Sequence, residues 1–247
     1  FGNEYYPIQW VIDSTKTSTI DFKGFQVDTV ISEVTGLERL KFDREKPITK
    51  EVTYYDYYKA ADSIEIPEAY IIKKQWKQVI DLLSANAIKF SVIERDTVKN
   101  VESYTIENFE TGNRPFEGHY LHYNTKVSAT IENISFEAGD VLVPTQQEGI
   151  RYLLETLEPE AVDSFFNWNF FDTILQQKEG FSPYVFEDTA FLMLQNDSVL
   201  RKEFEFNKQN DTAFSENWYA QLNWLFKKSE LYEKAHNRYP VYRVLKR

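Results

Sequence analysis

The chain has 247 residues, enough for one large domain or two smaller ones with a sizeable core. Its 39 Asp and Glu outnumber 28 Lys and Arg, and the formal net charge of −11 argues against nucleic-acid binding and against polybasic attachment to membranes. The absence of Cys excludes disulfides, Cys-ligated zinc and thiol catalysis, and no stretch approaches the roughly 18 apolar residues of a membrane span.

The first 65 residues predict β structure and turns. Thr17–Val27 alternates apolar and polar residues, as a half-buried strand does, and Gly24 is expected at a bulge or bend. Glu51–Lys59 is a second, Tyr-rich run, and the charged stretch Glu38–Pro47 is expected to be a connector between them. We therefore treat residues 1–65 as a β-rich segment.

A strand–helix–strand unit is predicted next. Ala69–Ile72 is a short apolar strand, and Gln75–Ala87 places its apolar residues three and four apart, which indicates an amphipathic helix. Lys89–Glu94 follows as a strand. Further strands are expected at Val101–Phe109 and Lys126–Phe136.

The remainder of the chain is expected to be mainly helical, with a closing strand at Tyr239–Leu245. Thr145 begins a capping-box pattern before an apolar stripe, and a second helix is expected over residues 161–175, after Pro159. Ser198 and Ser215 are expected to cap two more helices. The prediction is an α+β fold. Residues 66–247 form a mixed α/β to helical domain, which is either separate from residues 1–65 or part of one compact unit with them.

Three histidines are the only candidates for His-based metal or acid–base chemistry. His119 and His122 have a His-x-x-His spacing, but their setting indicates a loop or strand, where residues three apart point to opposite faces. Glu117 could pair with one of them, or it could be a solvated loop charge. Neither a His-x-x-Glu pair nor a Gly-x-Ser-x-Gly elbow is present, and the P-loop pattern is missing.

The block Asp163–Asp172 holds five aromatic residues within seven positions. They cannot all lie on one face of a helix. The block is therefore either buried on most sides or partly exposed as a recognition surface that includes Trp168. A stand-alone module that binds carbohydrate or peptide is the function that such a surface would support.

Several short blocks occur in the order found in one family. They are Asp13–Lys16, Phe22–Phe25, Glu33–Leu37, Pro67–Ile72, Glu117–Tyr120, Val143–Gln146, Leu157–Pro159 and Asp163–Asp172. In these blocks the chain resembles the region that follows the catalytic domain in zinc carboxypeptidase-like proteins of the M14 type from Bacteroidetes-like bacteria.

The resemblance implies a non-catalytic accessory region that packs on the peptidase domain of the same polypeptide and helps to shape its cleft. It implies a periplasmic or secreted protein whose zinc lies in the upstream domain, with no cofactor in this chain. The family holds its zinc with a His-x-x-Glu pair, and this sequence lacks one. No catalytic or metal-binding residue is therefore carried over, and Glu117, His119, His122 and Trp168 remain as candidate binding residues.

Overall fold

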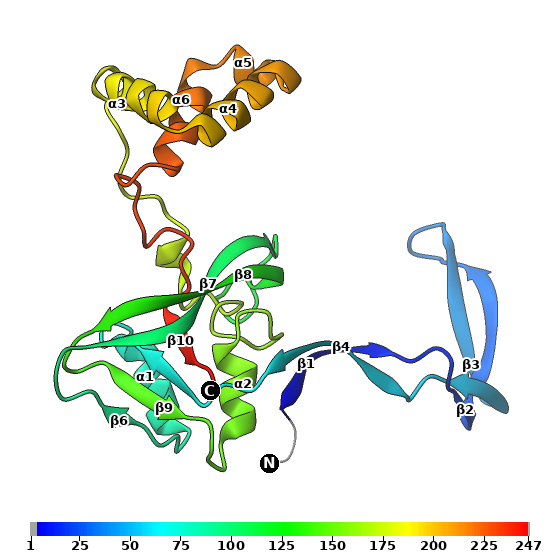
Figure 1. The fold of residues 1–247 in the computed structure, drawn as a ribbon. Coiled ribbons are helices and arrows are strands. Elements are labelled where there is room, and N and C mark those ends of the chain that lie inside the picture. Colours follow the sequence, from blue (N-terminus) through cyan, green and yellow to red (C-terminus); the bar gives the residue numbers. More distant parts are fainter. Residues whose placement is uncertain (1–3, 247) are drawn as a thin grey trace. The chain divides into compact units, whose positions relative to one another are not determined.

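The computed structural model describes residues 4–246 (Figure 1). The chain divides into two compact units, Phe1–Ile66 and Pro67–Arg247, here called unit 1 and unit 2. Among the described residues, the regular elements of unit 1 are all strands, and unit 2 combines a sheet with helices. This content confirms the predicted α+β fold, with strands concentrated early and helices late in the chain.

Unit 1 consists of two antiparallel strand pairs. One pair joins β1 (Tyr5–Ile12) to β4 (Tyr58–Glu65), and the other joins β2 (Ser18–Ile31) to β3 (Glu38–Tyr54). The expected connector Glu38–Pro47 was wrong, because these residues belong to β3. The strand is held by backbone pairing with β2, and its charged side chains extend into solvent.

The β2–β3 pair, here called the ribbon, is irregular next to the predicted bulge position. The register shifts between Phe25 and Gln26, one residue after Gly24. The tight turn at the tip places Gly36 at a φ of +70°, a conformation that a residue with a Cβ adopts only under strain. Eight of its large apolar side chains are at least 41% exposed: Ile20, Phe22, Phe25, Val27, Ile31, Leu40, Phe42 and Ile48.

Unit 2 is built on one six-stranded sheet of order β6-β9-β5-β10-β7-β8. Its strands are β5 (Ala69–Ile72), β6 (Ser91–Val92), β7 (Thr97–Thr111), β8 (His122–Phe136), β9 (Val141–Pro144) and β10 (Val241–Val244). The closing strand predicted at the end of the chain is thus β10, and it lies inside the sheet between β5 and β7. Buried Ile71, Val101, Phe136 and Tyr242 form a cluster at this centre.

The first two helices of unit 2 correspond to predicted ones. The first, α1 (Lys77–Ala85), buries Val79 and Leu83, as its apolar stripe indicated. The second, α2 (Ile150–Leu157), starts later than the capping-box pattern suggested. The hydroxyl of Thr145 does not cap it, since it donates to the backbone oxygen of Pro67 at 2.6 Å and ties β9 to the start of β5.

The helix expected over residues 161–175 was wrong. After α2 the chain forms a series of turns that ends in the short 3-10 helix η1 (Asp172–Ile174). The side chain of Asn167 donates to the backbone oxygens of Ala161 and Val162, which fixes the turns in place of a helical hydrogen-bond ladder. This path lets Phe166 and Phe171 both be fully buried, which one helix face could not achieve.

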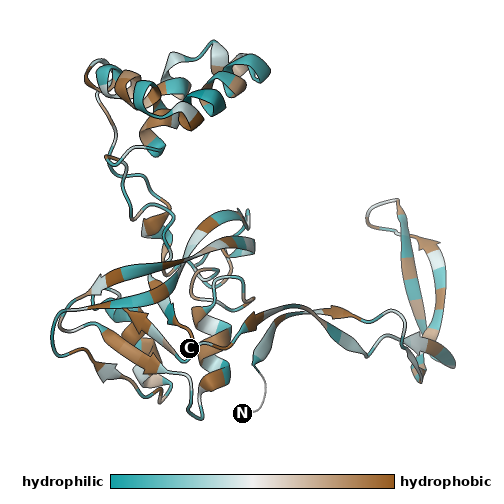
Figure 2. Cartoon of the chain, in the orientation of Figure 1, coloured by the Kyte–Doolittle hydropathy of each residue, from teal (hydrophilic) through white to brown (hydrophobic). Residues whose placement is uncertain are grey.

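The last helices form a small group with its own core. They are α3 (Pro183–Asn196), α4 (Ser198–Asn210), α5 (Thr212–Ser215) and α6 (Trp218–Lys227). The expected caps Ser198 and Ser215 were wrong, because the side chains of Asp197, Asp211 and Asn217 cap α4, α5 and α6. The core of this four-helix segment contains Phe186, Ala190, Phe204, Leu222, Leu225 and Phe226. Figure 2 shows apolar and polar residues alternating along these helices.

Candidate functional site

Three of the four candidate residues surround the connection between β7 and β8. His119 lies in that connection and forms a two-way backbone bridge with Phe116, with N–O distances of 2.8 and 2.9 Å. Glu117 sits at the tip of this tight turn, is exposed and has a φ of +48°. The fourth candidate, Trp168, comes from the turns after α2. The fold therefore brings together residues that the sequence separates by almost fifty positions.

An aromatic patch forms where these segments meet. The ring of His119 lies 5.5 Å from that of Trp168 and is stacked on Phe170 at 6.1 Å, and Phe116 lies 6.1 Å from Trp168. Phe116 is 56% exposed, whereas His119, Trp168 and Phe170 are half-buried. The aromatic block is thus divided between the core, which takes Phe166 and Phe171, and this patch.

His122 lies in a different environment from His119. It is the first residue of β8, only 6% exposed, and its ring packs against Phe109 and Phe166 at 4.6 and 5.1 Å. Its Nε2 is 3.0 Å from Oδ1 of Asp172, and its Nδ1 is 2.9 Å from the hydroxyl of Thr111. The imidazole therefore links the end of β7 to the start of η1.

A hydroxyl, an imidazole and a carboxylate in sequence have the order of an acyl-transfer triad. Such chemistry also requires backbone N–H groups that are free to stabilise an oxyanion. The nearby N–H groups of Gly112 and His122 already donate to the oxygens of Leu121 and Asn167. The geometry supports a structural role for His122, which holds two turns together.

A buried charge cluster that was not among the predicted sites lies near the centre of the sheet. Arg243 on β10 is 4% exposed and Glu158, just after α2, is 1% exposed. The guanidinium Nε lies 3.0 Å from Oε1 of Glu158, and Nη1 pairs with Glu102 on β7. The hydroxyl of Tyr70 on β5 donates to the same Glu158 oxygen at 2.5 Å. The cluster ties three strands to the end of α2.

The protonation of this cluster follows from its burial. Burial raises the pKa of Glu158 above its ordinary 4.5, although Arg243 and the hydroxyl of Tyr70 act in the opposite direction. Burial would lower the pKa of Arg243, but the neighbouring Glu158 and other groups raise it, so the guanidinium stays charged. The folded environment therefore favours the charged form of Arg243 and the protonated, neutral form of Glu158.

We expect the native chain to lose stability relative to a Glu158→Gln variant as the pH rises above about 4.5. The folded state holds the Glu158 proton at a pH where the unfolded state has released it. This stabilisation is fully present below the ordinary pKa of Glu158. It is lost as the pH rises through the raised pKa of Glu158 in the folded state. Urea titrations over a pH series measure the trend, and the exposed Glu148→Gln is the control. A native chain that gains stability relative to Glu158→Gln as the pH rises would contradict the assignment.

Metal binding by the two neighbouring histidines is not expected. Within residues 4–246, no group of three or more His, Cys, Asp or Glu side chains is arranged to hold a metal ion. His119 faces the aromatic patch, while His122 uses both ring nitrogens in hydrogen bonds. We predict that protein purified without a His-tag contains no stoichiometric zinc by metal analysis. Zinc bound jointly by His119 and His122 would overturn this prediction.

Comparison with known proteins gives one weak relationship. The chain is 29% identical over 99 residues to the protein named Carboxypeptidase 2 of Trichophyton tonsurans, and equally to that of Trichophyton equinum. This region resembles part of a carboxypeptidase. The match covers 40% of this chain and only 18% of each fungal protein. No family model and no solved structure matches the chain.

The part of the chain that the structure describes also contains no helix with the length and apolar character of a membrane span.

Proposed function

We propose that this chain is a non-catalytic accessory region of a carboxypeptidase-like protein, which packs on the peptidase domain and helps to shape its substrate cleft. In the finer form of the proposal, the parent is a bacterial zinc carboxypeptidase-like protein of the M14 type. This region then follows the catalytic domain of a periplasmic or secreted chain. The similarity to the two fungal carboxypeptidases supports the coarser relationship.

The exposed apolar side chains of the ribbon carry the packing proposal. A two-stranded hairpin is marginally stable in water unless a third strand, a helix or another surface covers one face. Phe22, Phe42 and Leu40 are 55, 60 and 62% exposed, although such side chains gain free energy when they are buried. A partner surface that covers the ribbon would supply the burial that unit 1 lacks there.

The charge of the ribbon suits an interface with another protein surface. Residues 18–54 carry six basic and seven acidic side chains, so the ribbon is nearly neutral, whereas the whole chain has a formal charge of −11. Interspersed charges around apolar side chains resemble the polar rim and apolar centre of protein–protein interfaces. The partner in this proposal is the peptidase domain of the same polypeptide.

A second candidate function is favoured by the aromatic patch. Its half-buried Trp168 and exposed Phe116 would present ring faces to a sugar or an extended peptide. In that case the chain is an independent binding module, and the ribbon plays no part in recognition. Trp168→Ala would then abolish ligand binding with little effect on association between domains.

Separate expression of the peptidase domain and of this region tests the accessory role. We expect the two to associate when mixed, and the presence of this region to change cleavage of a C-terminal-residue substrate. Phe22→Ser and Phe42→Ser should weaken the association. Phe206→Ser, at a position 64% exposed on α4, is the matched control and should leave it unchanged. A peptidase domain that is fully active and stable alone, and ignores this region, would overturn the proposal.

A further inference from the structure

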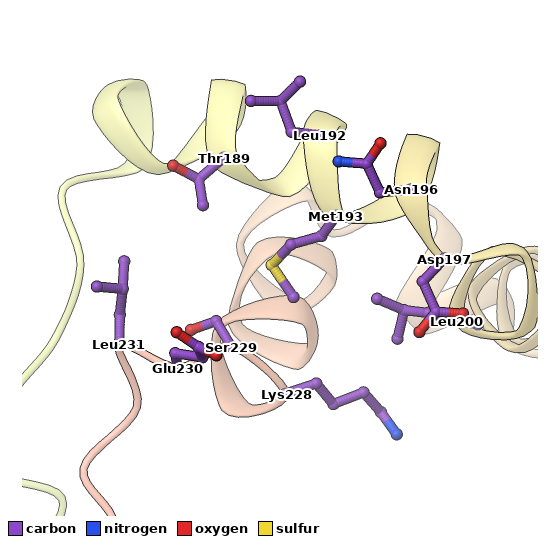
Figure 3. A pocket seen from close by; sticks show the side chains of 10 residues that line it. All are labelled: Thr189, Leu192, Met193, Asn196, Asp197, Leu200, Lys228, Ser229, Glu230 and Leu231. Atoms are coloured by element: carbon purple, nitrogen blue, oxygen red, sulfur yellow. Dashed lines mark hydrogen bonds between the residues drawn. The ribbon is translucent and has the colours of Figure 1, made fainter.

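A groove of about 660 Å³ opens on the four-helix segment, outside every site discussed above. Figure 3 shows Met193 pointing from α3 toward the end of α6, with Leu231 on one side and Leu200 on the other. Its volume lies in the range of sites that take up a ligand or part of a partner. The groove therefore offers three apolar side chains to something outside the segment.

Apolar side chains around the groove are unusually exposed. Leu192 and Leu231 line it at 52 and 64% exposure. Together with Met193 and Leu200, they give the groove an apolar lining that gains free energy when a partner buries it. The walls come from α3, the start of α4 and the turn after α6, none of which is a strand, so the groove offers side chains to a partner and no strand edge.

The charges at the rim are mostly negative. Lys228 lines the groove but is neutralised by Glu203, whose two carboxylate oxygens both lie 3.2 Å from its ammonium group. Asp197 accepts from the N–H groups of Val199 and Leu200 at the start of α4, and Glu230 lies exposed at the opposite end. Residues 183–231 as a whole carry eight acidic and five basic side chains.

We infer that this groove binds a cationic amphipathic helix of a partner protein. Leucine-like side chains at positions i, i+3, i+4 and i+7 of such a helix would contact the apolar floor, as in other helix-in-groove interfaces. Its Lys or Arg side chains would lie against the acidic rim near Glu230. Charge complementarity of this kind selects the partner and disfavours acidic helices, which the rim repels.

The test uses the full chain and a designed probe. The probe is a dye-labelled peptide of Leu and Lys, about four helical turns long with Leu at amphipathic spacing, and binding is followed by fluorescence anisotropy. The matched peptide carries Glu in place of every Lys. We expect saturable binding of the Leu/Lys peptide and little binding of the Leu/Glu peptide. Equal binding of both peptides, or binding of neither, would overturn the inference.

Matched variants separate the groove from the general attraction of an acidic protein for a basic peptide. Glu230→Lys should weaken binding of the Leu/Lys peptide roughly tenfold, whereas Glu216→Lys makes the same charge change away from the groove and should have little effect. Leu231→Ser should weaken binding more than Phe206→Ser, which alters an equally exposed side chain. All four positions are exposed, so folding should be preserved, and thermal melts check this. Equal effects within either pair would contradict a specific site.

Discussion

Replacing Arg243 by Met is expected to destabilise unit 2 by about 3–5 kcal/mol, the usual effect of removing one partner from a buried charge pair. The substitution leaves Glu158, only 1% exposed, without its guanidinium partner. Methionine has a similar length and fills much of the same space, so the loss reports charge rather than volume. The midpoint of a urea titration measures the effect.

Two further variants show whether the charge is responsible. Adding Glu158→Gln to Arg243→Met removes the unpaired carboxylate and should restore part of the lost stability. Arg151→Met changes a side chain that is 83% exposed on α2, and it should shift stability by less than about 0.5 kcal/mol. If the single and double variants unfold at the same denaturant concentration, the cluster contributes packing and little electrostatic stabilisation.

Replacing Phe171 by Ala should cost about 3–5 kcal/mol, the range for a large aromatic side chain removed from a core. Phe171 is fully buried and packs edge-to-face on Trp76 at 4.8 Å and on Tyr239 at 5.1 Å. A residual cavity would separate α1 from the end of the chain. Thermal or urea unfolding of the variant gives the value.

Trp168→Ala is the informative comparison, because it removes a still larger ring from the same block. Trp168 is only half-buried, with contacts to Phe116 and His119, so we expect a cost of about 1–2 kcal/mol. If the whole block were one buried helix, Trp168→Ala would cost more stability than Phe171→Ala. A Trp168→Ala variant that loses as much stability as Phe171→Ala would place the patch in the core.

Most strands and the first helix could be predicted because their apolar residues follow a clear period. Ala69–Ile72 is short and apolar, Tyr239–Leu245 alternates and contains β10, and Gln75–Ala87 shows one stripe. The pairing of β10 between β5 and β7 could not be predicted, since nothing local in the sequence encodes which distant strand a segment will contact.

The failures have separate physical causes. The helix α3 was not foreseen, because its apolar residues are spread around the axis and give no single stripe. The expected cap residues Ser198 and Ser215 are each close to an Asx residue that caps instead, and local sequence does not decide between adjacent candidates. In β3, charged residues are compatible with a strand that buries neither face, so the polarity of the sequence was misleading.

The candidate site was foreseen only as a set of residue types. The aromatic-rich block Asp163–Asp172 indicated Trp168, and the His-x-x-His spacing indicated His119 and His122. Their separation into an exposed patch and a buried hydrogen-bonded position depends on the path of the turns after α2. The charge cluster of Arg243 and Glu158 joins residues 85 positions apart. A lone Arg in an otherwise apolar strand was its one signal, and it did not identify the partner.

The central position of β10 has a consequence for synthesis and quality control. While a ribosome is still producing residues 231–240, β5 and β7 each have an open edge that only Val241–Val244 will close. The sheet cannot complete its hydrogen bonds until those residues emerge, so the nascent chain exposes two pairing-competent edges until then. A chain truncated just before this strand would have its sheet divided between β5 and β7, which would make it a natural substrate for chaperones and proteases.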